Sequence, residues 1–163
     1  MSVVTTPLTR SRSKGSKEEK ARKVTAEDLR LEAFLRAQRA QQVSAKNAIE
    51  VLEVAAMFEI IRGELINNRL YNDELNKRIK LGIVDPLNHI AKEMFPQFDA
   101  QLNDLIDKCD KAYDNPDARD QATQVAVRQA DKILVNMNDV LTKMLEYESF
   151  NEAIRLLREI IEG

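Results

Sequence analysis

Cysteine and histidine are almost absent from this chain, and their scarcity excludes several kinds of site. The 163 residues include one cysteine and one histidine. A lone Cys109 cannot form a disulfide within the chain or a cluster of thiolate ligands for zinc or iron–sulfur. A lone His89 excludes the paired Glu-x-x-His motifs of di-iron bundles and the zinc motif His-Glu-x-x-His. We therefore expect no metal centre of the usual helical kinds and no cofactor.

Glycine and proline are also scarce, with four residues of each. So few glycines leave little material for a phosphate-binding loop, and neither a Gly-x-Gly-x-x-Gly nor a Gly-x-Ser-x-Gly motif occurs. So few turn formers also leave few places to divide the chain into short strands, while the abundant residues mostly favour helix. The sequence predicts an all-α fold without the marks of nucleotide hydrolysis or acyl transfer.

A long uncharged apolar run is missing as well. The most apolar stretch, residues 48–66, carries five charged residues, and each would cost about 2.5–3.5 kcal/mol at a bilayer centre; they are Glu50, Glu53, Glu59, Arg62 and Glu64. No apolar run near Met1 is long enough for the core of a signal peptide. We expect a soluble chain, and its compartment stays open.

Charge divides the chain into a basic tail and an acidic body. Residues 1–24 hold seven Lys and Arg against Glu18 and Glu19, although the whole chain has a net charge of −2. Residues 1–23 have too little apolar content to order, so we expect a mobile linker. The alternatives are an organelle transit peptide and an arm that contacts polyanions; the arm would use Arg10, Arg12, Lys14 and Lys17.

Residues 24–163 are expected to form a single helical-bundle domain. Thr25 can cap a long first helix that runs to about Leu70, because its hydroxyl can accept hydrogen bonds from first-turn amides. Turn-forming residues then indicate about five to six helices in an antiparallel, coiled-coil-like bundle; the turns are expected near residues 71–73, 82–85, 95–96, 114–117 and 147–149.

Two charges interrupt the most apolar part of the first helix. Apolar residues cover most of the helix circumference over residues 50–66, so this segment is expected to be the buried centre. Glu59 and Arg62 break the apolar arc one turn apart, where they can pair with each other. We expect a buried ion pair of structural rather than catalytic use.

The end of the chain predicts a helix that docks on a partner. Ser149 and Glu152 form a capping box, and apolar residues then recur on one face with polar residues opposite. Together with the central Phe58, this face is our predicted interaction surface; its residues are Phe150, Ile154, Leu157 and Ile161.

Two further groups of residues are candidates for chemical sites. Asp85, His89 and Glu93 lie four residues apart on one helix face and are a weak candidate for holding a divalent metal, because a cap, a surface histidine and an ion pair one turn apart is the commoner explanation. Cys109 has no histidine near it and three nearby aspartates, which would raise the pKa of a thiol. Neither group predicts an enzyme.

Four stretches between Leu31 and Ile161 carry a resemblance to a known group of proteins. They are residues 64–70, 83–87, 94–96 and 143–161, with the sequences ELINNRL, IVDPL, MFP and KMLEYESFNEAIRLLREII. In order and spacing they resemble the C-terminal helical region of large, coiled-coil-rich bacterial proteins of the planctomycete type, which have no assigned function. The resemblance implies a long parent protein of a kind that can associate with membranes, and it implies no catalytic residues.

These features together favour a structural role. We expect a non-catalytic scaffold or assembly module that acts through apolar helix faces and associates with itself or with a partner helix. One alternative is an adaptor that binds a partner helix in a groove. Another is an enzyme with an unrecognised metal or carboxylate site.

Overall fold

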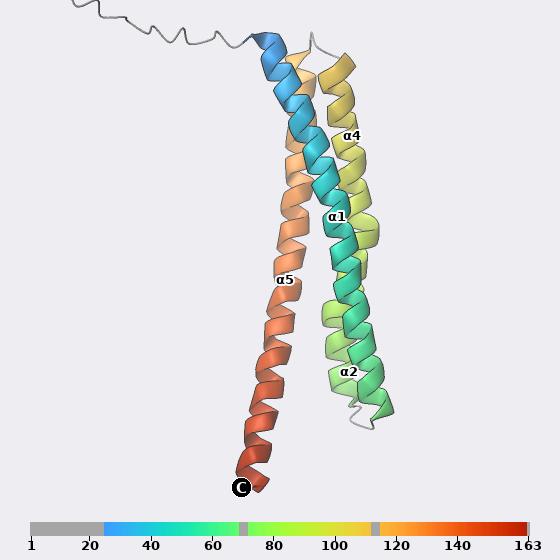
Figure 1. Ribbon diagram of the computed structural model, residues 1–163, viewed down its shortest axis with the longest axis vertical. Helices are drawn as coiled ribbons and strands as arrows, with labels where there is room; N and C mark the ends of the chain where they lie inside the picture. Colours follow the sequence, from blue (N-terminus) through green and yellow to red (C-terminus); the bar gives the residue numbers. More distant parts are fainter. Residues whose placement is uncertain (1–24, 69–71, 112–114, 163) are drawn as a thin grey trace, which may run out of the picture.

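The computed structural model describes residues 25–68, 72–111 and 115–162, and these residues form three long helical segments (Figure 1). The first is α1 (Ala26–Asn67). The second joins α2 (Asp73–Ile79), the π-helix η1 (Lys80–Val84), α3 (Asp85–His89), the π-helix η2 (Ile90–Met94) and α4 (Phe95–Lys111) without a break. The third is α5 (Pro116–Glu162). No strand occurs in the described residues, so the all-α prediction is confirmed. The expected number of five to six helices was wrong, because the described residues form three helical segments.

Helix α1 begins where the sequence predicts. The Asp28 backbone N–H donates to Thr25 Oγ1 at 3.1 Å, and the Thr25 backbone N–H donates to Asp28 Oδ2 at 3.0 Å. This capping box satisfies two amides that have no partner inside the helix. The hydrogen bonds from Thr25 also hold the pKa of the Asp28 carboxyl below its usual value. Asn72 caps α2 through its side chain alone, which accepts from the Glu74 N–H at 2.8 Å.

Two of the five expected turns coincide with breaks between described helices. Helix α1 ends at Asn67 and α2 begins at Asp73, while α4 ends at Lys111 and α5 begins at Pro116. The turns expected near residues 82–85, 95–96 and 147–149 were wrong, because the backbone stays helical through all three.

The two prolines inside the second segment are accommodated by the π-helices just before them. A proline has no N–H, and its ring collides with the carbonyl four residues earlier in an α-helix. Here the N–H of Asp85, next to Pro86, bonds to the Lys80 carbonyl, and the N–H of Phe95, next to Pro96, bonds to the Ile90 carbonyl. Each bond spans five residues instead of four. The wider turns let the helix continue past both prolines.

The second segment lies against both α1 and α5. Figure 1 shows α1 running in the same direction as α5, with the second segment running the opposite way. Over the described residues, α1 and α5 each approach α4 closely, whereas they approach each other much less. Their Phe58 and Tyr147 rings meet edge to face, with centroids 6.5 Å apart. The two outer helices therefore share one support and leave a gap between them.

The core is centred on the π-helical part of the second segment. Its largest fully buried side chains include Ile79, Ile83 and Ile90. Around them a buried cluster joins all three segments; its members are Val51, Ala55, Ile83, Leu87, Ile90, Ala91, Met94, Phe95, Ile133 and Val140. The buried Gln129 of α5 donates to the Met94 carbonyl at 3.2 Å, which satisfies a polar group at the edge of this core.

The segment expected to be the buried centre of α1 is buried on one side only. Val51 and Ala55 lie in the core, but Met57 and Ile60 are 61% and 62% exposed. The expectation was wrong because the second segment covers a single face of α1 here. An apolar residue on the other face then stays in contact with solvent.

Candidate interaction surface

An apolar groove lies between the upper halves of α1 and α5, with α4 as its floor. It encloses about 460 Å³. Large side chains of α4, namely Phe98, Leu102 and Leu105, form the floor. Small side chains form most of the walls and keep the groove open; they are Ala33, Ala37 and Ala40 of α1, and Thr123, Ala126 and Ala130 of α5.

A second apolar groove continues the first toward the other end of the molecule. It encloses about 510 Å³ between α1 and α5, with Leu87 of α3 at its base. Val51 and Val54 come from α1, while Met137, Leu141 and Met144 come from α5. Methionine side chains adapt their shape readily, so this groove could accept apolar side chains of several sizes. We call the two grooves together the α1–α5 groove.

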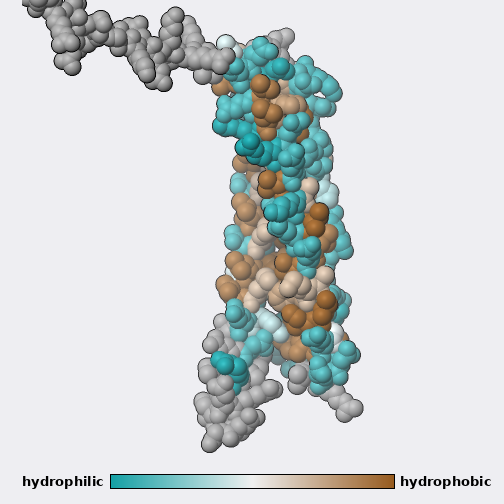
Figure 2. Space-filling model, in the orientation of Figure 1, coloured by the Kyte–Doolittle hydropathy of each residue, from teal (hydrophilic) through white to brown (hydrophobic). Residues whose placement is uncertain are grey.

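Helix α5 borders this groove with an exposed apolar stripe of regular spacing. Val127, Leu134 and Leu141 follow one another at seven-residue intervals and are 52%, 57% and 51% exposed. Seven residues are two helical turns, so the three side chains lie along one line of the helix. Leu29, Val43 and Met57 on α1 are exposed at fourteen-residue intervals. Figure 2 shows brown, hydrophobic patches along the helices on this side of the molecule.

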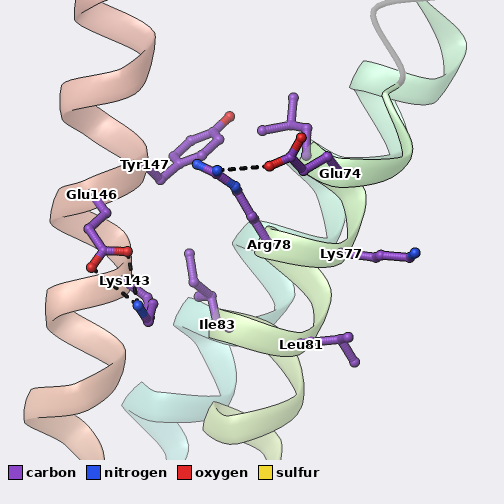
Figure 3. Close-up of a pocket in the computed structure, with 10 residues that line it drawn as sticks. Glu74, Lys77, Arg78, Leu81, Ile83, Lys143, Glu146 and Tyr147 are labelled. Carbon is purple, nitrogen blue, oxygen red and sulfur yellow. Dashed lines mark hydrogen bonds and ion pairs between the residues drawn. The ribbon is translucent and has the colours of Figure 1, made fainter.

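A third hollow, of about 540 Å³, lies between α2, η1 and α5 and carries charge (Figure 3). Arg78 donates to Glu74 at 2.9 Å within α2, and Lys143 pairs with Glu146 at 3.0 Å within α5. The side chain of Arg78 extends from α2 toward Tyr147 of α5. The lining residues include no histidine, cysteine or serine, so this hollow has no imidazole base and no thiol or serine hydroxyl.

Glu59 and Arg62 form the predicted ion pair, but not in a buried place. Arg62 donates to both carboxylate oxygens of Glu59, and its other amino group donates to Asn76 Oδ1 of α2 at 3.0 Å. The side chains of Arg62 and Glu59 are 25% and 42% exposed, so the expected burial was wrong. The pair lies at the edge between α1 and α2, where it joins the two helices.

The residues weighed as a metal site do not gather into one. His89 Nδ1 lies 3.1 Å from Glu93 Oε2 on the exposed surface. Across residues 25–68, 72–111 and 115–162, no three His, Cys, Asp or Glu side chains form a group that could hold a metal ion. The π-helix η2 begins directly after His89 and includes Glu93, so the α-helical spacing expected from the sequence does not hold there.

Cys109 is buried in α4, at 1% exposure. Burial raises the pKa of its thiol, and the positive charges of Arg119 and Arg30 oppose that rise. Desolvation, and not the neighbouring aspartates named from the sequence, is the main cause. A buried, protonated thiol is a poor nucleophile.

No family model, curated protein or solved structure matches this chain. The resemblance to the helical region of planctomycete-type proteins therefore stays a hypothesis. None of the described helices is long and apolar enough to cross a membrane.

Several predicted interaction residues lie outside the described part of the structure. Phe58 is described, and it packs partly buried against the core. The side chains of Phe150, Ile154, Leu157 and Ile161 lie outside the described residues, as do Arg10, Arg12, Lys14 and Lys17. The exposed stripe of α5 was missed from the sequence. Its signal is a pair of adjacent apolar residues repeated every seven positions, at 126–127, 133–134 and 140–141.

Proposed function

We propose that this chain is a non-catalytic assembly module that joins other helices through its exposed apolar faces. The observation that carries the proposal is the seven-residue stripe of Val127, Leu134 and Leu141 beside the open α1–α5 groove. Large side chains at this spacing normally face another helix, because burial of apolar surface stabilises a packed pair. A contiguous apolar patch of this kind on a protein surface is typical of an interaction site.

Sedimentation velocity of the full chain, from low to high micromolar concentration, tests this function. We expect the average mass to rise with concentration. Leu134→Glu should abolish the rise, since it places a charge in the stripe. Leu31→Glu is the matched control, because Leu31 is also about half exposed, at 52%, but does not line the groove. A chain that stays monomeric at high micromolar concentration contradicts the self-association part of the proposal.

An adaptor that binds the helix of another protein is the second candidate. The groove walled by alanines favours it, since small wall residues leave room for an apolar helix face above Phe98 and Leu102. Ala130→Trp would place a large side chain in this groove at a partly exposed position, and circular dichroism of the variant checks that it still folds. The adaptor function predicts a monomeric wild-type chain whose binding to its partner helix is lost in Ala130→Trp and kept in Leu31→Glu.

A further inference from the structure

We propose that the occupant of the α1–α5 groove is helix α5 of a second copy of the chain, running antiparallel to the first. This inference rests on the assembly function proposed above and names its partner. Helices α1 and α5 run in the same direction on one support (Figure 1). A helix that completes a four-helix arrangement with alternating directions must then run opposite to both. Two copies related by a two-fold axis provide such a helix to each other.

The exposed stripe of α5 has the symmetry that such a dimer needs. An interface around a two-fold axis uses the same surface on both copies, so residues equally far from the axis must match. Leu134 lies midway between Val127 and Leu141. With the axis at Leu134, that residue meets its own copy, and Val127 meets Leu141 of the second copy. All three contacts join large apolar side chains that are about half exposed in the single chain.

The same axis sets which part of α1 faces the second copy. Phe58 of α1 lies beside Tyr147 of α5, so the two parallel helices have a known register. At an equal rise per residue, Val43 lies at the level of about residue 132 of α5, as follows from that contact. The two-fold axis then brings Val43 within one turn of Val135 of the second copy. Both valines are exposed, at 50% and 59%.

Charges beside these valines are complementary in the same register. Lys46, one turn beyond Val43, then lies within one turn of Asp131 of the second copy, and Glu50, two turns beyond Val43, lies within one turn of Arg128. All four side chains belong to exposed residues. Lys46 and Glu50 now pair along α1 at 3.4 Å, and Arg128 donates to Gln124 at 3.3 Å. Exposed pairs of this kind exchange partners at little cost, so they are available to select the antiparallel register.

Cysteine cross-linking of the full chain tests the position of the axis. We expect Leu134→Cys to form a covalent dimer under mild oxidation, because the two substituted residues meet at the axis within the reach of a disulfide. Leu141→Cys alone should not cross-link, but an equal mixture of Leu141→Cys and Val127→Cys should. The wild-type chain is the negative control, since its Cys109 is buried.

Charge reversal tests the register by a second route. Glu50→Arg and Arg128→Glu should each weaken the dimer several-fold in sedimentation equilibrium, and the double variant should restore it. Lys77→Glu, on the exposed surface of α2, is the control that should change nothing. If the double variant regains the dimer affinity, residues 50 and 128 face each other across the interface. A general effect of charge on solubility would not restore the affinity.

The outcomes separate this inference from the function on which it rests. If the mass rises with concentration but Leu134→Cys gives no covalent dimer, the α5 interface is wrong and the assembly function stands. If the chain is monomeric at every concentration, the second-copy inference and the self-association part of the proposed function are both overturned. If the groove is filled only by a helix of another protein, the second-copy inference is overturned in favour of the adaptor.

Discussion

Isoleucines that look equivalent in the sequence differ widely in how far they are buried. Ile90 is completely buried between the three helical segments, whereas Ile60 is 62% exposed on α1. Truncation of a buried isoleucine removes its contacts and leaves a cavity. Truncation of an exposed one removes little that folding had buried.

We therefore expect Ile90→Ala to lower the free energy of unfolding by about 2–5 kcal/mol. Ile60→Ala should change it by less than about 0.5 kcal/mol, as is usual for surface substitutions. Urea denaturation followed by circular dichroism measures both. Equal losses in the two variants would contradict the placement of Ile90 at the centre of the core.

The raised pKa of the Cys109 thiol makes the stability of the folded chain depend on pH in a definite direction. Burial favours the protonated thiol in the folded chain, so the unfolded chain loses that proton at lower pH. The resulting stability is present at neutral pH, below the pKa of an unfolded cysteine. It is lost as the pH rises through the pKa of the folded thiol.

Labelling with a thiol reagent across neutral and mildly alkaline pH checks this prediction. The folded chain should react much more slowly than the chain in urea, and the difference should persist above the ordinary pKa of cysteine, about 8.5. Cys109→Ala is the blank for the reagent. Equal rates for the folded and unfolded chains would show that Cys109 is not buried.

At the scale of elements, the second segment shows how tertiary contacts override local breaking signals. Gly82, Pro86 and Pro96 all predict helix ends, yet the backbone passes through them with two π-turns. These turns lie where Ile83 and Ile90 enter the core. Burial of these side chains offsets the poorer hydrogen-bond geometry of the wide turns.

Gly82→Ala distinguishes a helical glycine from a helix cap. An added Cβ would meet the side chain of Lys143 at 3.7 Å, which is an ordinary contact. Alanine favours helix over glycine by about 0.5–1 kcal/mol, so we expect Gly82→Ala to raise the unfolding free energy by about that amount. Gly63→Ala, with nothing within 4 Å of its added Cβ, is the matched control and should give a similar gain. A loss of stability at Gly82 alone would indicate that the helix ends there, at the turn expected from the sequence near residues 82–85.

At the scale of the whole molecule, three helical segments leave one side uncovered. The second segment supports α1 and α5, and Phe58 meets Tyr147 across the space between these two helices. Apolar side chains at heptad spacing then remain exposed along α5. A chain with such a surface has free energy to gain from association.

The basic residues of the tail bear on binding to anionic lipid and nucleic acid, apart from self-association. Residues 1–24 carry seven Lys and Arg against two Glu, while the rest of the chain is acidic overall. If the tail is an arm that contacts polyanions, deletion of residues 1–23 should weaken binding to anionic lipid vesicles and to single-stranded nucleic acid, with a loss that shrinks at high salt. Co-sedimentation with vesicles and fluorescence anisotropy measure it. Unchanged binding would show that the tail is only a linker, and self-association should be the same with or without it.

The sequence alone determined the helical class, the cap at Thr25, that one helix ends before Asp73 and another before Pro116, and the scarcity of residues for metal and nucleophilic chemistry. These properties depend on composition or on contacts within one helical turn, so neighbours in the sequence suffice to predict them. Only the tertiary structure decided that α5 continues through Ser149, that Glu59 and Arg62 lie at an edge, and that Val127, Leu134 and Leu141 stay exposed. Each of these depends on which helix faces are covered by segments distant in the sequence, and packing between helices outweighs the local preferences of single residues.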